Sequence, residues 1–357
     1  MKVLVLSSQA SNTGSTLRAF YIYKYLKKHA DADYIAPPFK SMPFMLDFLF
    51  TLFYYFFMTL NRKYNAVIIV KPYPNTVLPA LILKAGGAKL IIDIDDMDYG
   101  YRGGFLSGLI KNIQHVLTEK ADYLTSHNET LIKLIEKEHP RFKGNVYMLK
   151  QCVDLSLYKK TSAAAVLSRR IKSVYNGKKI LFYTAHLNIA SYLDDIFDAV
   201  KGLKEDFVLI VGGGGPMLNY YKKRAAKMGL SDKVVFTGQL TQQEIVPYIM
   251  AADLCLVYYK NEPVNLHRAS MKLREYLALG AEVAANSVGE IKDFKGYVHL
   301  SGVSAKAYSQ MISKCLRKMN KLGAGGKTYI YGYYDWNKGI KGFVLKLKEI
   351  IGVKFKA

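Results

Sequence analysis

The sequence contains only three cysteines, and they stand far apart. Cys152, Cys255 and Cys315 form no C-x-x-C pair, and Cys255 lies inside an apolar run. A disulfide framework or a cysteine-based zinc site is therefore not indicated. The opening MKVLVLSSQ has an apolar run too short for a signal peptide and is expected to form the first core strand. We expect a protein of the reducing cytoplasm.

Acidic residues are also scarce, with 28 Asp and Glu against 51 Lys and Arg, for a net charge of +23. Such a surplus attracts nucleic acid, anionic lipid or phosphorylated ligands. The sequence has no zinc finger, basic zipper or RNP-like motif, and its lysines are spread through helical segments such as KKRAAK. We therefore expect no nucleic-acid partner. A basic soluble protein with solvated lysines is the plain alternative.

The chain of 357 residues is half hydrophobic and is long enough for two domains. Apolar strand-like runs alternate with helical segments in two series, the first from KVLVLSS to NVYMLKQCVD and the second from KKILFYTAHL to AKAYSQMISKCLRKM. This alternation predicts an α/β protein with two doubly wound, Rossmann-like domains, residues 1–165 and 166–335. Ligands of such sheets bind at the carboxyl ends of the strands, so two facing domains would hold a substrate between them.

A run of glycines, VGGGGP, follows the strand FVLI and precedes a helix. Gly213 and Gly214 permit close backbone approach and positive φ, which suits a nucleotide or sugar at the strand end. The run matches neither G-x-G-x-x-G nor the P-loop. A tight turn without a ligand is the alternative interpretation.

Two further strand ends carry polar residues. DIDDMD, residues 93–98, lacks the glycine and terminal glutamate of a calcium loop, so we expect no metal site and assign Asp95 or Asp96 to acceptor hydroxyls. Capping of the next turn is the alternative. His127 also follows a strand, next to Ser126 and Asn128, and either residue could instead cap the following helix.

The segment HRASMKLREYLALG is expected to form a helix after the strand and loop DLCLVYYKNEPVN. The unpaired amides at the start of a helix favour an anion, and Arg268, Ser270 and Lys272 strengthen that preference, so a diphosphate is a good match. Glu275, three residues after Lys272, can accept hydrogen bonds from a ribose diol. A surface ion pair between the two, worth about 0.2–0.5 kcal/mol, is the alternative. His186, after the strand ILFYTA, is a further candidate for an anionic group.

With these residues in place, the sequence resembles the family 4 retaining glycosyltransferases of the GT-B fold over nearly the whole chain. KLREYLALGAEVAA looks like the helix that bears the second glutamate of the family's E-x7-E motif, and the block from VLIVGGGGP to DLCLVYY is similar to the segment before it. SNTGSTLRA, with Gly14, resembles the first glycine-bearing loop, and KQCVDLSLY the interdomain segment. YDWNKG resembles the point after which residues 336–357 cross back to the first domain as a helix.

The resemblance implies that Glu275 binds the donor ribose, that Lys272 and the helix start hold the diphosphate, and that the enzyme uses a nucleotide sugar with retention of configuration, no obligatory metal and no other cofactor. Asp96 and His127 become candidates to position the acceptor. Two positions depart from the family pattern: His267 replaces the first glutamate, and Ala185-His186 replaces a glycine-arginine pair. These departures leave open an inactive GT-B-like protein that binds sugar nucleotides or serves as a scaffold.

The aromatic segment PFMLDFLFTLFYYFFMTLNRK predicts a helix over about residues 43–60 that is apolar almost all round. A membrane span is disfavoured, because it would separate two strands of one sheet. We expect a helix that packs on the sheet with one face and enters the membrane interface with Phe53, Phe56 and Phe57, flanked by Arg62 and Lys63. This predicts peripheral association with the inner face of an anionic membrane and a lipid-linked or saccharide acceptor. Burial against the second domain or a dimer partner is the alternative.

Overall fold

The computed structural model describes residues 1–8, 14–37, 44–96, 105–318 and 320–352. The chain divides into two compact units. The first contains Met1–Cys152, His267–Ala269 and Trp336–Ala357, and the second contains Val153–Leu266 and Ser270–Asp335. The predicted limit at residue 165 lies inside a helix of the second unit. Val153 marks the division because its N–H donates to the Tyr334 carbonyl at 2.7 Å, which ties this segment to the second unit.

The first unit has one six-stranded parallel sheet, in the order β2-β1-β3-β4-β5-β6. Its strands are β1 (Lys2–Ser7), β2 (Asp31–Ile35), β3 (Ala66–Val70), β4 (Lys89–Ile94), β5 (Tyr123–Ser126) and β6 (Val146–Met148). Its helices are α1 (Gly14–Leu26), α2 (Phe44–Thr59), α3 (Pro74–Ala85), α4 (Phe105–Lys120), α5 (Glu129–Glu138), the 3₁₀ turn η2 (Pro140–Phe142) and α14 (Trp336–Ile350).

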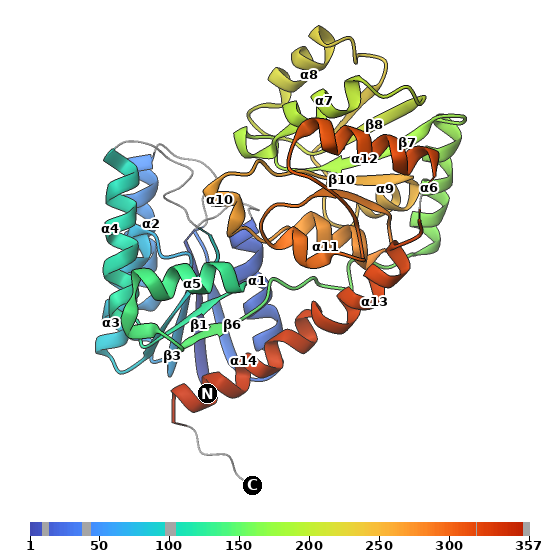
Figure 1. The fold of residues 1–357 in the computed structure, drawn as a ribbon. Helices are drawn as coiled ribbons and strands as arrows, with labels where there is room; N and C mark the ends of the chain where they lie inside the picture. Colours follow the sequence, from blue (N-terminus) through green and yellow to red (C-terminus); the bar gives the residue numbers. More distant parts are fainter. Residues whose placement is uncertain (9–13, 38–43, 97–104, 319, 353–357) are drawn as a thin grey trace. The chain divides into compact units, whose positions relative to one another are not determined.

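Helices cover both faces of this sheet, so its central strands are continuous apolar runs. All five residues of β3, AVIIV, are buried, as parallel strands between two helical layers require. Figure 1 shows α2, α3 and α4 on one side of the sheet and α1 and α14 on the other. This follows from right-handed crossovers, because the chain reverses direction across the sheet after β2.

A buried ion pair joins α1 to β4. Arg18 donates to both carboxylate oxygens of Asp93, at 2.6 and 2.8 Å, and neither side chain has any exposed surface. Thr125 donates to the same carboxylate at 2.5 Å. Trp336, the single tryptophan of the chain, starts α14 and stacks on Tyr25 at 6.3 Å between ring centres. Asp93, the first carboxylate of DIDDMD, is therefore a core residue that holds the sheet and α1 together.

The second unit has another six-stranded parallel sheet, in the order β12-β11-β10-β7-β8-β9. The strands are β7 (Lys179–Thr184), β8 (Phe207–Gly212), β9 (Val234–Gly238), β10 (Leu254–Val257), β11 (Val283–Asn286) and β12 (His299–Ser301). The α-helices are α6 (Ser162–Val174), α7 (Leu193–Lys201), α8 (Leu218–Lys227), α9 (Val246–Ala251), α10 (Pro263–Leu266), α11 (Met271–Ala278), α12 (Ala305–Arg317) and α13 (Gly323–Tyr333), with 3₁₀ turns η3 (Ile189–Ser191) and η4 (Gly289–Phe294).

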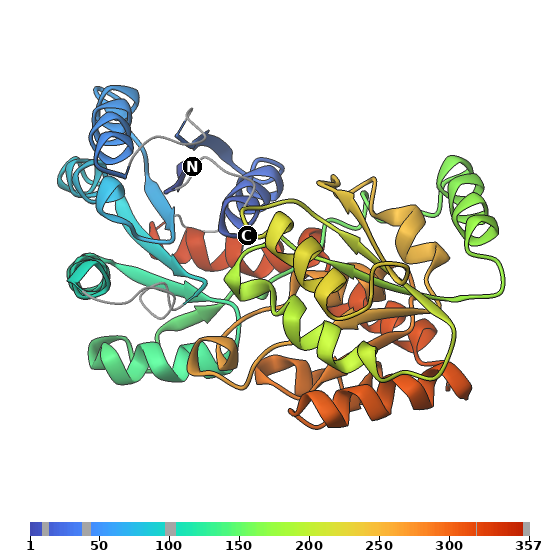
Figure 2. The ribbon, with the colours of Figure 1, turned by 90° about the horizontal axis from the view of Figure 1, so that it is seen from above.

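In this sheet the strand order reverses between β7 and β10. Open parallel sheets bind ligands at the carboxyl ends of the strands beside such a reversal. The loop after β7 and the start of α11, which follows β10, are therefore the segments that the topology favours for a ligand. Figure 2 shows helices on both sides of each sheet, and the predicted α/β class with two doubly wound units is confirmed.

The aromatic segment forms α2, Phe44–Thr59, close to the predicted 43–60. Across the described part of the chain, no helix combines the length and the apolar character that crossing a membrane would need.

Candidate active site

The glycine run after β8 packs against the loop after β7. Gly213 has φ 144°, and a Cβ at this position would lie 1.9 Å from the carbonyl oxygen of Ala185. The Gly214 carbonyl accepts from the N–H of Leu187 at 2.8 Å, and its own N–H donates to the Gln239 side chain at 3.2 Å. The glycines are thus required to bring two loops together, which supports the tight-turn interpretation. A donor contact of Gly213 or Gly214 stays a prediction.

His186 lies between the two residues that this packing fixes, and its side chain is exposed. Its neighbour Ala185 donates its N–H to the Gly212 carbonyl at 3.0 Å. The loop backbone is therefore held on both sides of His186. The imidazole is exposed to solvent just after β7, the position predicted from the sequence.

The start of α11 is fixed by a cap and a buried ion pair. Ser270 is completely buried and accepts the Leu273 N–H at 3.4 Å, so it is the N-cap of the helix. Its own N–H donates to Glu290 Oε1 at 2.9 Å. Arg274 donates to the two oxygens of Glu290 at 2.6 and 2.8 Å. Ser270, predicted to strengthen the preference of the helix start for an anion, uses its hydroxyl to cap its own helix.

Lys272 and Glu275 have different partners within the second unit. Lys272 Nζ donates to the Tyr183 hydroxyl at 2.9 Å and lies 4.0 Å from the centre of that ring. Glu275 accepts a hydrogen bond from the Tyr158 hydroxyl at 2.6 Å, and Gln242 donates to the same hydroxyl at 3.2 Å. No ion pair within 4.0 Å links the two residues in the described chain. The surface-pair alternative is thereby disfavoured.

The carboxyl group of Glu275 is buried, and burial is the main cause that raises its pKa. Hydrogen bonds from Tyr158 and Gln242 and the charge of Lys272 work in the opposite direction. A carboxylate has about four acceptor positions, so these two donors leave capacity for a ligand hydroxyl. The site therefore presents a positioned acceptor at Glu275 and a cation at Lys272.

Sequence reasoning did not identify Tyr158, Arg274 or Glu290 as functional residues. Tyr158 stands 117 positions before Glu275, and Glu290 stands 16 after Arg274. Only the tertiary fold brings such residues together. The nearest available signal was an arginine inside an otherwise apolar helical segment, since a buried guanidinium needs a partner.

His267 and Arg268, predicted to accompany Lys272, group with the first unit. The His267 carbonyl accepts from the Asn128 amide at 2.9 Å. Burial lowers the pKa of its imidazole, and a hydrogen bond with the Thr130 backbone opposes this change. Within the described residues its Nδ1 is buried without a hydrogen-bond partner. Arg268 is half-buried, and a donor contact for either residue stays a prediction.

His127 is buried, and both ring nitrogens are engaged within the first unit. Asn128 donates its amide to Nδ1 at 2.9 Å, so the proton lies on Nε2 and is donated to the Asp95 carbonyl at 2.6 Å. Asn128 also caps α5 by accepting the Leu131 N–H at 2.8 Å. The cap alternative is therefore confirmed for Asn128. Through its bond to the Asp95 carbonyl, His127 holds the backbone just before Asp96.

A pocket of about 390 Å³ opens beside this segment. Its polar lining combines carboxylates after β4 and at the end of α5 with basic side chains after β3, on α4 and after α5: Lys71, Asp95, Asp96, Lys111, His115, Glu138 and His139. Lys71 has φ 65°, a left-handed conformation that is uncommon for a residue with a side chain. Such outliers cluster at functional sites. The predicted candidate Asp96 thus lines a cavity, and Lys71 was not predicted from the sequence.

The remaining predicted residues lie on α1, on α2 and just after α2. Gly14 is the first residue of α1, and residues 9–13 before it lie outside the described residues. Phe53 and Phe57 are 58% and 67% exposed, and Phe56 is half-buried. Arg62 and Lys63 are exposed. The opposite face of α2 is anchored by Tyr55, whose hydroxyl donates to the Ser7 carbonyl.

Known proteins resemble this chain in sequence and in fold. Residues 164–322 match the family model of the glycosyl transferases group 1. An alpha-monoglucosyldiacylglycerol synthase of Streptococcus pneumoniae is 32% identical over 118 residues, which cover 32% of this chain and 25% of that protein. The chain thus spans about a quarter of the length of this relative.

Two solved structures share the fold over nearly their whole length. A sucrose-phosphate synthase of Thermosynechococcus elongatus has a TM-score of 0.80 at 13% identity, covering 99% of this chain and 100% of its own. HepE of Anabaena, in complex with UDP and glucose, has a TM-score of 0.78 at 14% identity, covering 98% and 100%. The two-sheet GT-B fold is confirmed.

Proposed function

We propose, from the match of residues 164–322 to the family model of the glycosyl transferases group 1, that this chain is a glycosyltransferase. It moves a sugar from a nucleotide diphosphate to a lipid-linked or saccharide acceptor, with retention of anomeric configuration. The observation that carries the proposal is the arrangement on α11. Lys272 and Glu275 lie three residues apart, and each is held by a tyrosine instead of by the other.

In this proposal Glu275 accepts the ribose hydroxyls of the donor. Hydrogen bonds from Tyr158 and Gln242 hold the carboxyl group in place, so less side-chain entropy is lost when the ligand binds. Lys272 binds the diphosphate with its ammonium group, and the amides at the start of α11 contribute partial positive charge.

These cations also assist the chemical step. As the sugar leaves, negative charge grows on the diphosphate, and preorganised positive groups stabilise that charge. His186, exposed at the end of β7, is a further group that can approach the diphosphate. No metal ion is required for this step in our proposal.

Uridine diphosphate glucose is the first donor to test. Support comes from HepE, whose structure contains UDP and glucose, and from the streptococcal relative, whose name specifies a glucosylated lipid. His267 stands where the family has a glutamate, so donors with a different sugar belong in the same screen.

The acceptor binds in the pocket of the first unit. Asp96 lines this pocket, and its neighbour Asp95 has a buried Oδ1 without a hydrogen-bond partner among the described residues. Carboxylates accept hydrogen bonds from sugar or glycerol hydroxyls. His127 fixes the segment by its hydrogen bond to the Asp95 carbonyl. His127 is therefore a positioning residue in this proposal.

The acceptor reaches the enzyme at the inner face of the cell membrane. The exposed phenyl rings of Phe53 and Phe57 enter the lipid interface, and Arg62 and Lys63 contact anionic headgroups. Each basic residue near such a surface contributes about 1 kcal/mol. A lipid acceptor of the kind that the streptococcal relative's name contains fits this location.

A donor screen by thermal shift tests the proposal. A bound nucleotide sugar at 100 times its Kd stabilises the fold by about 2.7 kcal/mol. We expect Glu275→Ala to abolish the shift, while Asp232→Ala, which removes an exposed carboxylate of the same unit, leaves it intact. The proposal fails if no uridine or guanosine diphosphate sugar shifts the parent protein.

The second candidate function is an inactive protein that binds sugar nucleotides. His267 and the Ala185-His186 pair, the two departures from the family pattern, favour it. Donor binding without transfer or donor hydrolysis would distinguish this protein from an enzyme.

A further inference from the structure

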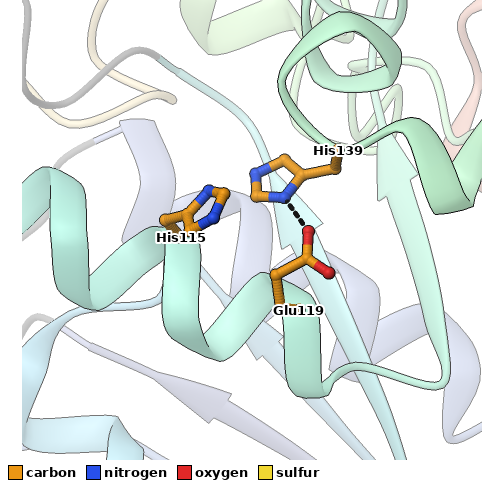
Figure 3. Close-up of side chains that lie close together, drawn as sticks. All are labelled: His115, Glu119 and His139. Atoms are coloured by element: carbon orange, nitrogen blue, oxygen red, sulfur yellow. Dashed lines mark hydrogen bonds and ion pairs between the residues drawn. The ribbon is translucent and has the colours of Figure 1, made fainter.

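Three side chains with metal-binding atoms lie together beside the first unit's pocket, and two of them, His115 and His139, line it. His115 and Glu119 project from α4, and His139 lies between α5 and η2 (Figure 3). One nitrogen of each imidazole and one oxygen of Glu119 lie within 4.8 Å of one another. The rings of His115 and His139 stack with 4.6 Å between their centres.

The backbone positions the three groups independently of any ligand. His115 and Glu119 are four residues apart on α4, so they share one helix face. His139 caps α5 by donating its N–H to the Ile135 carbonyl at 2.7 Å, and its own carbonyl accepts from Phe142 at 3.0 Å. His139 is buried, whereas His115 is exposed and can adjust its ring.

The donor set suits a divalent transition metal. Two imidazoles and one carboxylate are a common set of three protein ligands for Zn²⁺, with the fourth position open to water. Tetrahedral ligands at about 2.0–2.1 Å from the ion lie about 3.3 Å apart. To reach this spacing from a cluster whose atoms lie within 4.8 Å of one another, the exposed His115 ring would rotate. His139 Nδ1 and Glu119 Oε1, now 2.5 Å apart, would move slightly apart.

Glu119 is prepared for such a role. His139 donates a hydrogen bond from Nδ1 to Glu119 Oε1 at 2.5 Å, so two of the three ligand atoms already lie side by side. Arg141 lies 3.5 Å from the second carboxylate oxygen and also donates to the Ala121 carbonyl. Outer contacts of this kind orient metal ligands.

We propose that His115, Glu119 and His139 bind one Zn²⁺-like divalent cation, which links α4 to the end of α5 at the pocket wall. The ion takes the place of the hydrogen bond between His139 and Glu119, and a water or an oxygen of a pocket ligand completes its coordination. This inference does not depend on the proposed transferase activity, and the ion takes no part in the sugar transfer proposed above.

Zinc titration of the full chain, prepared without a histidine tag and freed of metal with a chelator, tests the site. Isothermal titration calorimetry is expected to show one Zn²⁺ per chain. His115→Ala should weaken binding at least about tenfold, since loss of even an outer contact costs 10–100-fold. His29→Ala, which removes an exposed histidine elsewhere in the unit, should leave binding unchanged.

Cobalt absorption gives a second readout. Co²⁺ in the site should produce visible bands of a four-coordinate ion, and His115→Ala should remove them. His139→Ala removes a buried side chain and can impair folding, so the exposed His115 carries the test. The proposal is overturned if stoichiometric binding is absent, or if His115→Ala binds Zn²⁺ as tightly as the parent protein.

Discussion

Arg274 and Glu290 form a buried ion pair that fixes the first turn of α11. The guanidinium donates to both carboxylate oxygens, at 2.6 and 2.8 Å, and also to the Ser270 carbonyl at 2.9 Å. Because Glu290 also accepts the Ser270 N–H, the same pair sets the N-cap and the orientation of the helix. Lys272 and Glu275 follow on that helix, so the positions of both proposed donor residues depend on this contact.

Breaking the pair should therefore destabilise the second unit. Arg274→Met leaves the buried Glu290 without its partner, a change that costs about 3–5 kcal/mol. Urea unfolding measures the loss. Arg317→Met is the control, because Arg317 pairs with Glu205 at 3.3 Å but is largely exposed, and such pairs contribute less than about 1 kcal/mol. Equal effects of the two substitutions would contradict a structural role for the buried pair.

Glu275→Gln should stabilise the protein near neutral pH. Burial raises the pKa of Glu275 in the folded chain, so the folded state holds this proton more tightly than the unfolded state. Stability from this group is present below the ordinary carboxyl pKa of about 4.3 and declines as pH rises to the folded-state pKa. Glutamine avoids the decline and can still accept from Tyr158.

The difference in unfolding free energy between Glu275→Gln and the parent protein, measured in urea from pH 4 to pH 8, tests this. The advantage of the variant should grow with pH. A difference that does not change with pH would show that the buried carboxyl group has an ordinary pKa.

Gly213→Ala should disrupt the contact between the loops after β7 and β8. The added Cβ would meet the Ala185 carbonyl oxygen at 1.9 Å, at a φ that side-chain-bearing residues rarely adopt. We expect a loss of about 2 kcal/mol or more in unfolding free energy. Gly202→Ala serves as control, since a Cβ there meets nothing within 4 Å. Equal stability of the two variants would refute the packing argument.

Phe53→Ser combined with Phe57→Ser should release the protein from phosphatidylglycerol vesicles. Each ring is more than half exposed, and complete burial of a phenylalanine is worth about 1.5–3 kcal/mol. Co-sedimentation should fall at least about tenfold. Val174→Ser, which removes an exposed apolar side chain from α6, should not change it. Undiminished co-sedimentation of the folded double variant would exclude the interface role of α2.

The architecture could be predicted because strands that are buried on both faces appear in the sequence as continuous apolar runs. Runs such as VLVL in β1 and AVIIV in β3 are apolar along their whole length, as strands covered on both faces must be. The length of α2 and the helix cap at Asn128 were also predictable, because both depend only on residues close together in the sequence.

Long-range contacts could not be predicted in this way. Asp93 belongs to a carboxylate cluster in the sequence, yet it is a core partner of Arg18, which stands 75 positions earlier. Tyr158 and Glu290 likewise acquire their roles from residues distant in the chain. The cluster of His115, Glu119 and His139 contains no cysteine pair or short sequence motif from which it could have been predicted.

The measurement that tests the central claim most directly is sugar transfer from radiolabelled uridine diphosphate glucose to diacylglycerol in anionic vesicles. The parent protein should form a glucosylated lipid. Lys272→Met should lower kcat/KM at least about hundredfold, because the cation that stabilises the leaving diphosphate is lost, while Lys306→Met, at an exposed lysine of α12, should retain full activity. Product formation by Lys272→Met at the parent rate would contradict the proposed donor site.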